Sequence, residues 1–431
     1  MFAIHQRTRR RICQAGFCLL CAMPTTGLLA WTASMKTGSH LARCRQELGE
    51  RLGLTVRCER IRYPQPGQSV YERFELADAE TGEWVLRCRS LEVTRTGRTL
   101  ALAPGDVEVA APRANKLLRL VQRRLAHELP GDDAVWLTPT QVTLVTPSAS
   151  QTYEDVDCRI DTQGDASTAT LHFRLPDPQP GEPPMVAITR NRSPAGISTT
   201  IKLDTLGTEL PVSVFSPWLD LQRELGRDAA FSGSFTVVEG TDRTDCQIEG
   251  LFSDLDLHRL VTRRFPHHLT GIANVELKAD ISEGGVVEAV GLLRCESGAI
   301  GDSLLAAAID LLDCQPGTAL QGRRLTAGTH QVFHDLAFDF TVNREGVRLE
   351  SWADAQPAGA LLLDVRGASL LGAPSGEPLP LVQLVRALVP ESELLVPATK
   401  ETARLVPWLP LPPAVPAPGA KPQAPPLTFE E

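Results

Sequence analysis

The chain has 431 residues, of which 42% are hydrophobic and 5% aromatic, and its formal net charge is −9. Nucleic-acid-binding proteins carry a basic surface, so this acidic balance argues against DNA or RNA as a main partner. The length is sufficient for one elongated domain or two compact domains with a substantial core.

Residues 1–11 form a basic segment, and residues 12–35 behind it carry no charge. The uncharged run is about long enough to cross a bilayer as a helix, and the basic flank favours a cytoplasmic N-terminus. We therefore expect residues 12–35 to be a signal-anchor transmembrane helix in the cell inner membrane, single-pass, with the bulk of the chain in the periplasm. Pro24 and two threonines interrupt the run, so a cleaved signal peptide is the alternative.

Short runs of alternating apolar and polar residues follow a short predicted helix at 40–52. Ala169, Leu171 and Phe173 alternate with polar residues, and residues 336–342 repeat the pattern. Strict alternation is typical of strands with one buried and one solvated face. Turn residues separate these runs, as in 64–67 and 344–346. The sequence predicts a mainly β chain, built as an elongated, curled antiparallel sheet that forms a groove.

Helical patterns are few: residues 113–129, 216–224, 256–264 and 302–312 fit the period of a helix. We divide the predicted sheet at the Pro-rich loop, into an N-terminal part (36–175) and a C-terminal part (176–375). Residues 376–409 are predicted to be a helical or irregular end. Residues 410–431 contain eight prolines and are predicted to be a disordered tail.

The predicted helix at 113–129 has leucines and a valine on one face and several Lys and Arg residues on the remainder. Such a helix can lie on an anionic membrane surface. Alternatively, its apolar face packs against the end of the sheet and its basic face is solvated.

The sequence contains no nucleophile elbow, phosphate-binding loop or zinc-binding helix motif. His330 and His334 are predicted to lie on a strand, where residues four apart are about 13 Å from each other and therefore do not form a metal site alone. We expect His267 and His268 to be ordinary loop residues, and Asp254 and Asp256 to cap a helix. No catalytic, cofactor-binding or metal-binding residue is assigned, and the protein is predicted not to be an enzyme.

Seven cysteines lie outside the uncharged run, so disulfides in an oxidising compartment would leave one thiol unpaired. Cys58 and Cys88 are predicted to lie in the middle of neighbouring strands, which makes them our candidate pair. Residues 191–193 also match a glycosylation sequon, a short pattern that carries little information.

Two stretches resemble AsmA/TamB-like proteins. The first comprises residues 48–62, 70–78 and 81–93, which give a helix, two strands, a D-x-x-T-G turn and a further strand. The second comprises residues 231–235, 251–260, 269–271, 298–312 and 333–349, where a helix precedes an amphipathic hairpin. Together they cover about half of the chain.

The resemblance implies a periplasmic β-groove with an apolar lining, related to bridge-like lipid-transfer proteins. The expected function is to handle phospholipids or other apolar lipids between envelope membranes, or to assist outer-membrane assembly. The expected partners are these lipids, the inner membrane through residues 12–35, and envelope proteins of unknown identity. The alternative is a non-catalytic scaffold whose sheet is filled by its own side chains and whose tail or edge recruits a partner. A hydrolase with an unrecognised site is a third hypothesis.

Overall fold

The computed structural model describes residues 10, 14–126, 134–146, 150–162, 166–176, 181–193, 196–215, 221–240, 243–282, 287–326, 328–352 and 357–389. Strands predominate among them, so the chain is mainly β, as predicted. It divides into two compact units. Unit 1 comprises Met1–Thr208 and Val214–Leu219, and unit 2 comprises Glu209–Ser213 and Asp220–Glu431. The predicted Pro-rich tail at 410–431 and most of the basic segment at 1–11 lie outside the described residues.

An apolar helix, Gln14–Met35, begins the described part of unit 1 and is long enough to span a membrane, at about 33 Å. It contains a π-helical turn, η1 (Cys18–Ala22), followed by α2 (Met23–Met35). The two threonines after Pro24 do not break it, because each hydroxyl donates to a carbonyl one turn earlier; Thr26 Oγ1 lies 2.8 Å from Ala22 O. Their polar groups are therefore satisfied within the helix, which a lipid environment requires.

Helix α3 (Gly38–Leu52) confirms the helix predicted at 40–52. The Thr37 side chain caps its first turn, and Gly53 ends it in the left-handed conformation, at φ 66°. Glycine adopts this conformation without strain, which explains why the helix ends there. The helix contacts β1, the first strand of the sheet.

Twelve described strands form the sheet of unit 1, and most of their pairings are antiparallel. The strands are β1 (Thr55–Arg57), β2 (Arg60–Arg62), β3 (Gln68–Ala77), β4 (Trp84–Thr96), β5 (Thr99–Pro104), β6 (Val107–Ala110), β7 (Ala134–Leu137), β8 (Gln141–Val145), β9 (Ser150–Asp161), β10 (Ala166–Arg174), β11 (Met185–Ser193) and β12 (Gly196–Asp204). Unit 1 extends past the Pro-rich loop at which we divided the sequence, because β10 and β11 on either side of that loop pair with each other.

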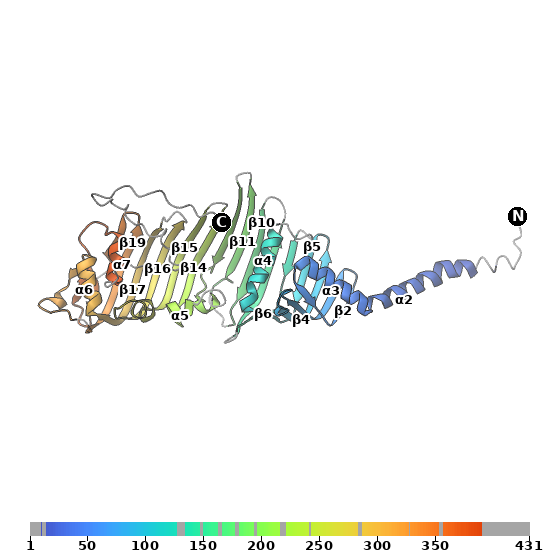
Figure 1. Cartoon of the computed structure of the whole chain (residues 1–431), viewed down its shortest axis with the longest axis horizontal. Helices are drawn as coiled ribbons and strands as arrows, with labels where there is room; N and C mark the ends of the chain where they lie inside the picture. Colours follow the sequence, from blue (N-terminus) through green and yellow to red (C-terminus); the bar gives the residue numbers. More distant parts are fainter. Residues whose placement is uncertain are drawn as a thin grey trace, which may run out of the picture. The chain divides into compact units, whose positions relative to one another are not determined.

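The sheet departs from the predicted antiparallel pairing at one place. β5 pairs with β7, and β6 with β8, in parallel. Parallel neighbours need a crossover connection, and the chain supplies it with η2 (Ala111–Arg113) and α4 (Ala114–Leu125), which lie on one face of the sheet. Figure 1 shows α4 against the strands of unit 1.

The described strands of unit 2 pair antiparallel with one another. Its strands are β13 (Leu210–Pro211), β14 (Ala230–Glu239), β15 (Thr244–Asp256), β16 (Leu269–Ser282), β17 (Val287–Gly301), β18 (Gln315–Pro316), β19 (His330–Asn343), β20 (Gly346–Ser351), β21 (Ala360–Asp364) and β22 (Ser369–Gly372). The helical segments are η3 (Val212–Phe215), α5 (Leu221–Leu225), η4 (His258–Thr262), α6 (Asp302–Leu311), η5 (Thr318–Leu320) and α7 (Leu381–Leu388).

Candidate functional site

One face of strands β14–β17 and β19 in unit 2 carries only apolar side chains and glycines over most of the strand length. We call it the inner face of unit 2. The strand registers place these positions in rows that run from strand to strand. The inner face consists of Phe231, Gly233, Phe235, Val237, Cys246, Ile248, Gly250, Phe252, Val275, Leu277, Ala279, Ile281, Ala289, Gly291, Leu293, Leu336, Phe338, Phe340 and Val342.

The alternation along β16 shows how the sequence builds this face. Leu277 points inward and is partly exposed, whereas its neighbours Glu276 and Lys278 are fully exposed on the opposite face. Lys278 Nζ lies 3.2 Å from Glu249 Oε2 of β15, so ion pairs form across the outer surface. Because successive strand residues point to opposite faces, charges are kept off the inner face.

Glycines on the inner face lie beneath phenylalanine rings of adjacent strands. A Cβ atom on Gly291 of β17 would lie 2.5 Å from Cζ of Phe340, its partner on β19. A Cβ atom on Gly250 of β15 would lie 2.9 Å from Cε2 of Phe231 on β14. The rings therefore lie over the glycine backbone, and this packing compensates for the missing side chains in the strands.

Helices cover the inner face at one end of its strands. Phe252 and Val275 pack with residues of α5 and η4. Leu293 and Phe338 pack against the main core of unit 2, to which α6 contributes the fully buried Leu305. Figure 1 shows α6 and α7 beside β17 and β19. Ile248, Leu277 and Phe340, which lie one or two rows further along, remain partly exposed.

His267 holds the helices of this end together, and the prediction that it is an ordinary loop residue was wrong. It is 4% exposed. Its Nε2 lies 2.8 Å from Ala387 O of α7 and its Nδ1 lies 3.1 Å from Ser303 Oγ of α6. A carbonyl only accepts, so Nε2 carries the hydrogen and Nδ1 is free to accept from the serine. This is a structural role for a buried histidine with both nitrogens satisfied.

In unit 1, α4 covers the corresponding apolar surface of its own sheet. Leu125 is 1% exposed and packs with Val121 against Ala169 of β10 and Ile188 of β11. We call this side of the sheet the inner face of unit 1. The contact favours the second of our two interpretations of the basic helix, in which its apolar residues pack against the sheet.

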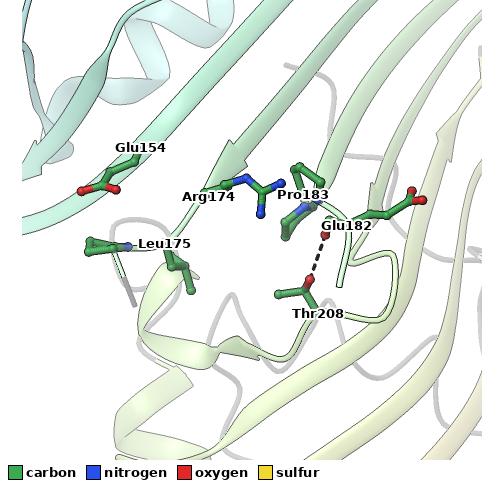
Figure 2. Close-up of a pocket in the computed structure, with 8 residues that line it drawn as sticks. Glu154, Arg174, Leu175, Glu182, Pro183 and Thr208 are labelled. Atoms are coloured by element: carbon green, nitrogen blue, oxygen red, sulfur yellow. Dashed lines mark hydrogen bonds between the residues drawn. The ribbon is translucent and has the colours of Figure 1, made fainter. Parts of the chain in front are cut away.

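A shallow pocket lies at the β10–β11 connection within unit 1 (Figure 2). Thr208 Oγ1 donates to Glu182 O at 2.8 Å, and Arg174 forms a long, exposed ion pair of 3.9 Å with Asp155. Such solvated charges interact weakly. The eight residues that line it include no histidine, serine or cysteine, and the hydroxyl of Thr208 donates to a backbone carbonyl rather than to a carboxylate. They are Glu154, Arg174, Leu175, Pro176, Glu182, Pro183, Pro184 and Thr208.

The histidines and carboxylates singled out in the sequence do not form a common site. His330 lies on β19 as predicted, and its ring is 5.3 Å from the ring of His268. Asp256 Oδ1 accepts from His258 N at the start of η4, which confirms its capping role. Asp254 lies in β15 at φ 56°, where the register with β16 shifts. Among the described residues, no group of three His, Cys, Asp or Glu side chains is placed to hold a metal ion.

The proposed pairing of Cys58 with Cys88 was wrong. Phe74 of β3 lies directly opposite Cys88, and Cys58 follows β1 on the other side of the same strand. Two strand spacings amount to about 9.6 Å, beyond the reach of a disulfide. Both thiols are free and buried. Burial raises the pKa of the Cys88 thiol to about 11.

The chain matches no protein-family model, and comparisons with curated proteins and with solved structures likewise give no match. The functional argument therefore depends on the geometry of the chain itself.

Proposed function

We propose that this protein is a membrane-anchored, periplasmic β-groove protein that handles lipids between envelope membranes or assists outer-membrane assembly, as AsmA/TamB-like proteins do. The observation that carries the proposal is the inner face of unit 2. It offers rows of apolar side chains, partly exposed at Ile248, Leu277 and Phe340, with the charged residues on the opposite face.

An acyl chain is the ligand that this surface suits. Each methylene removed from water gains about 0.8 kcal/mol. A chain that moves from a bilayer onto the sheet exchanges one apolar environment for another, so its net change in free energy is small. A surface of interchangeable aliphatic and aromatic side chains permits movement along it, and no single residue is essential.

The apolar helix Gln14–Met35 supplies the membrane end of the proposal. None of its most apolar window is buried, which suits a segment that lipid surrounds. The basic residues before it favour an N-terminus in the cytoplasm, with both units in the periplasm. A reporter fused after residue 36 should then be exported, and activity of a cytoplasmic reporter at that position would contradict this orientation.

A non-catalytic envelope scaffold is the second candidate, and two observations favour it. Helix α4 covers the inner face of unit 1 through the fully buried Leu125. The helices of unit 2 likewise fill one end of its inner face. In this case the sheet is a core for the protein itself and partners bind elsewhere.

The test is lipid extraction followed by native mass spectrometry on residues 37–431, expressed in the periplasm and purified without added lipid. Removing the exposed helix leaves the described cores of both units intact. Two variants form a matched pair on β15. Ile248→Asp places a charge on the inner face, and Gln247→Asp places the same charge on the exposed outer face.

The proposal expects phospholipids to co-purify with the unsubstituted chain and with Gln247→Asp. Ile248→Asp should reduce their amount several-fold, because a carboxylate in an apolar site is costly to desolvate. A stable chain without any lipid would contradict lipid handling and favour the scaffold. Equal lipid content in both variants would show that lipid lies elsewhere.

A further inference from the structure

Two arginines of β11 point to the inner face of unit 1. Arg190 and Arg192 lie two and four residues after Ile188, which packs against α4, so all three side chains point to the same face. The register of β11 with β10 and β12 is continuous over these residues. Arg192 Nη2 donates to Leu125 O at the end of α4, at 3.3 Å, which places that side chain on the same face. The inner face therefore changes from apolar to basic toward the end of the strand.

The buried nitrogen of the Arg190 guanidinium is unpaired within the described part of the chain. Nε of Arg190 is inaccessible to solvent and forms no hydrogen bond with any described residue. Across the strands, its neighbours are Ser167 on β10 and Thr199 on β12, neither of which carries a charge. Burying part of a cation without a counter-charge is unfavourable, so packing alone does not explain this residue.

Arg192 has a structural role that Arg190 lacks. The carboxyl end of a helix carries a partial negative charge, and Arg192 satisfies one of its carbonyls.

An exposed apolar side chain lies beside the arginines. Ile197 lies opposite Arg192 on β12 and is 50% exposed. Thr199 follows it on the same face opposite Arg190, and Ile201 beyond it packs in the core beneath α4. A planar guanidinium binds phosphate oxygens in a bidentate fashion, and the adjacent exposed isoleucine side chain suits an acyl chain.

We propose that Arg190, with Arg192 beside it, binds the phosphate group of a glycerophospholipid whose acyl chains lie against the half-exposed Ile197 of β12, where α4 ends. This inference rests on the proposed function and names its ligand class. Arg190 and Arg192 are consecutive inward residues near the end of β11. Their contact with the phosphate group would therefore fix the orientation of the lipid on the sheet.

The test uses the full chain in an uncharged detergent and a phosphatidylglycerol probe with a photoreactive diazirine in one acyl chain. Labelling of peptides from β10, β11 and β12 is quantified by mass spectrometry. Competitors are dioctanoyl phosphatidylglycerol, dioctanoylglycerol and inorganic phosphate. The variants are Arg190→Gln, Arg190→Met and the control Arg159→Gln, whose side chain lies over the Trp136 ring on the opposite face.

Arg190→Gln should lower labelling about tenfold or more, because the loss of a hydrogen bond to a charged group typically weakens binding by about that factor. Arg159→Gln should leave it unchanged. Dioctanoyl phosphatidylglycerol should compete at concentrations at which dioctanoylglycerol and inorganic phosphate do not. Arg190→Met should lose labelling and yet unfold at the same temperature as the unsubstituted chain or a higher one.

Each other outcome overturns the inference in a distinguishable way. Equal labelling of Arg190→Gln and Arg159→Gln would remove the phosphate site and leave acyl-chain binding in place. Competition by inorganic phosphate as strong as by the lipid would make this a free-phosphate site. A marked loss of thermal stability in Arg190→Met would assign the residue a structural role. No labelling in either unit would overturn the inference and the proposed function together.

Discussion

Asp302 begins helix α6 and is the most heavily hydrogen-bonded carboxylate at the end of unit 2. It is 2% exposed. Its Oδ2 accepts from Thr326 N, at 3.1 Å, and from Thr329 Oγ1, and its Oδ1 accepts from Gln331 Nε2, at 2.9 Å. The carboxylate thus ties the start of α6 to the segment that leads into β19.

The cost of removing this carboxylate follows from those three donors. Asp302→Ala leaves Thr326 N and Gln331 Nε2 without this acceptor, whereas the Thr329 hydroxyl can donate to Thr326 O, 2.7 Å away. A buried unsatisfied donor costs about 1–3 kcal/mol. Thr326 and Thr329 are exposed, so water replaces part of what is lost. We expect the free energy of unfolding of unit 2 to fall by about 2–4 kcal/mol. Asp302→Asn retains one oxygen and should cost about half as much.

The control is Asp310→Ala on the same helix, where the side chain is exposed. It should change stability by less than about 0.5 kcal/mol. The free energies of unfolding are compared by urea unfolding that is monitored through the hydrogen exchange of α6 peptides, so that the comparison concerns unit 2 alone. If Asp302→Ala were as stable as Asp310→Ala, the reasoning about these hydrogen bonds would be refuted.

The same carboxylate makes the stability of unit 2 depend on pH, and the direction of the change follows from its pKa. Burial by itself would raise the pKa of Asp302, but hydrogen bonds from Thr329, Gln331 and Thr326 outweigh it and the pKa lies below its ordinary value. A lowered pKa stabilises the folded state above the unfolded value of about 3.9, and this contribution is lost as pH falls through the folded pKa. The stability difference between the unsubstituted chain and Asp302→Asn should therefore shrink below about pH 4.

Three further predictions concern packing and thiol chemistry. Leu125→Ala should destabilise unit 1 by about 2–5 kcal/mol in urea unfolding, since it opens a cavity between α4 and the sheet; no effect would show that α4 does not dock. Gly291→Ala should cost about 1–3 kcal/mol because its Cβ would lie 2.3 Å from Glu276 O and 2.5 Å from Cζ of Phe340, and a neutral result would contradict that packing. Cys88 should react slowly with maleimide at pH 8, since burial raises its pKa to about 11; rapid reaction, or a Cys58–Cys88 peptide in mass spectrometry, would refute the strand order.

Much of the secondary structure could be predicted from the sequence, because hydrophobic alternation and helical periodicity depend only on residues that are close to one another in the chain. The alternation at 336–342 predicted part of β19, and the helical pattern at 302–312 predicted α6. Thr37 and Gly53 are ordinary capping residues for α3, so its bounds followed closely. The apolar inner face could likewise be anticipated from the period of two in each strand.

Features that depend on contacts between distant segments were missed. The parallel pairing of β5 with β7 follows from the crossover of α4, which periodicity does not reveal. Burial of His267 requires α7, more than a hundred residues away, to supply the Ala387 carbonyl. Arg190 was not singled out in the sequence, and only the register with Ile188 and the position of α4 show which face it occupies.

The central claim is that lipid acyl chains lie on the inner face of the unit 2 sheet, and photo-crosslinking along β16 tests it most directly. A benzophenone side chain would be introduced in turn at each position from 276 to 281 of the full chain, in cells, and lipid adducts counted by mass spectrometry. The account predicts adducts at the inward positions, Leu277 and Ile281, and few at the outward positions, Glu276 and Asp280. Adducts of equal frequency on both faces, or none at the inward positions, would contradict it.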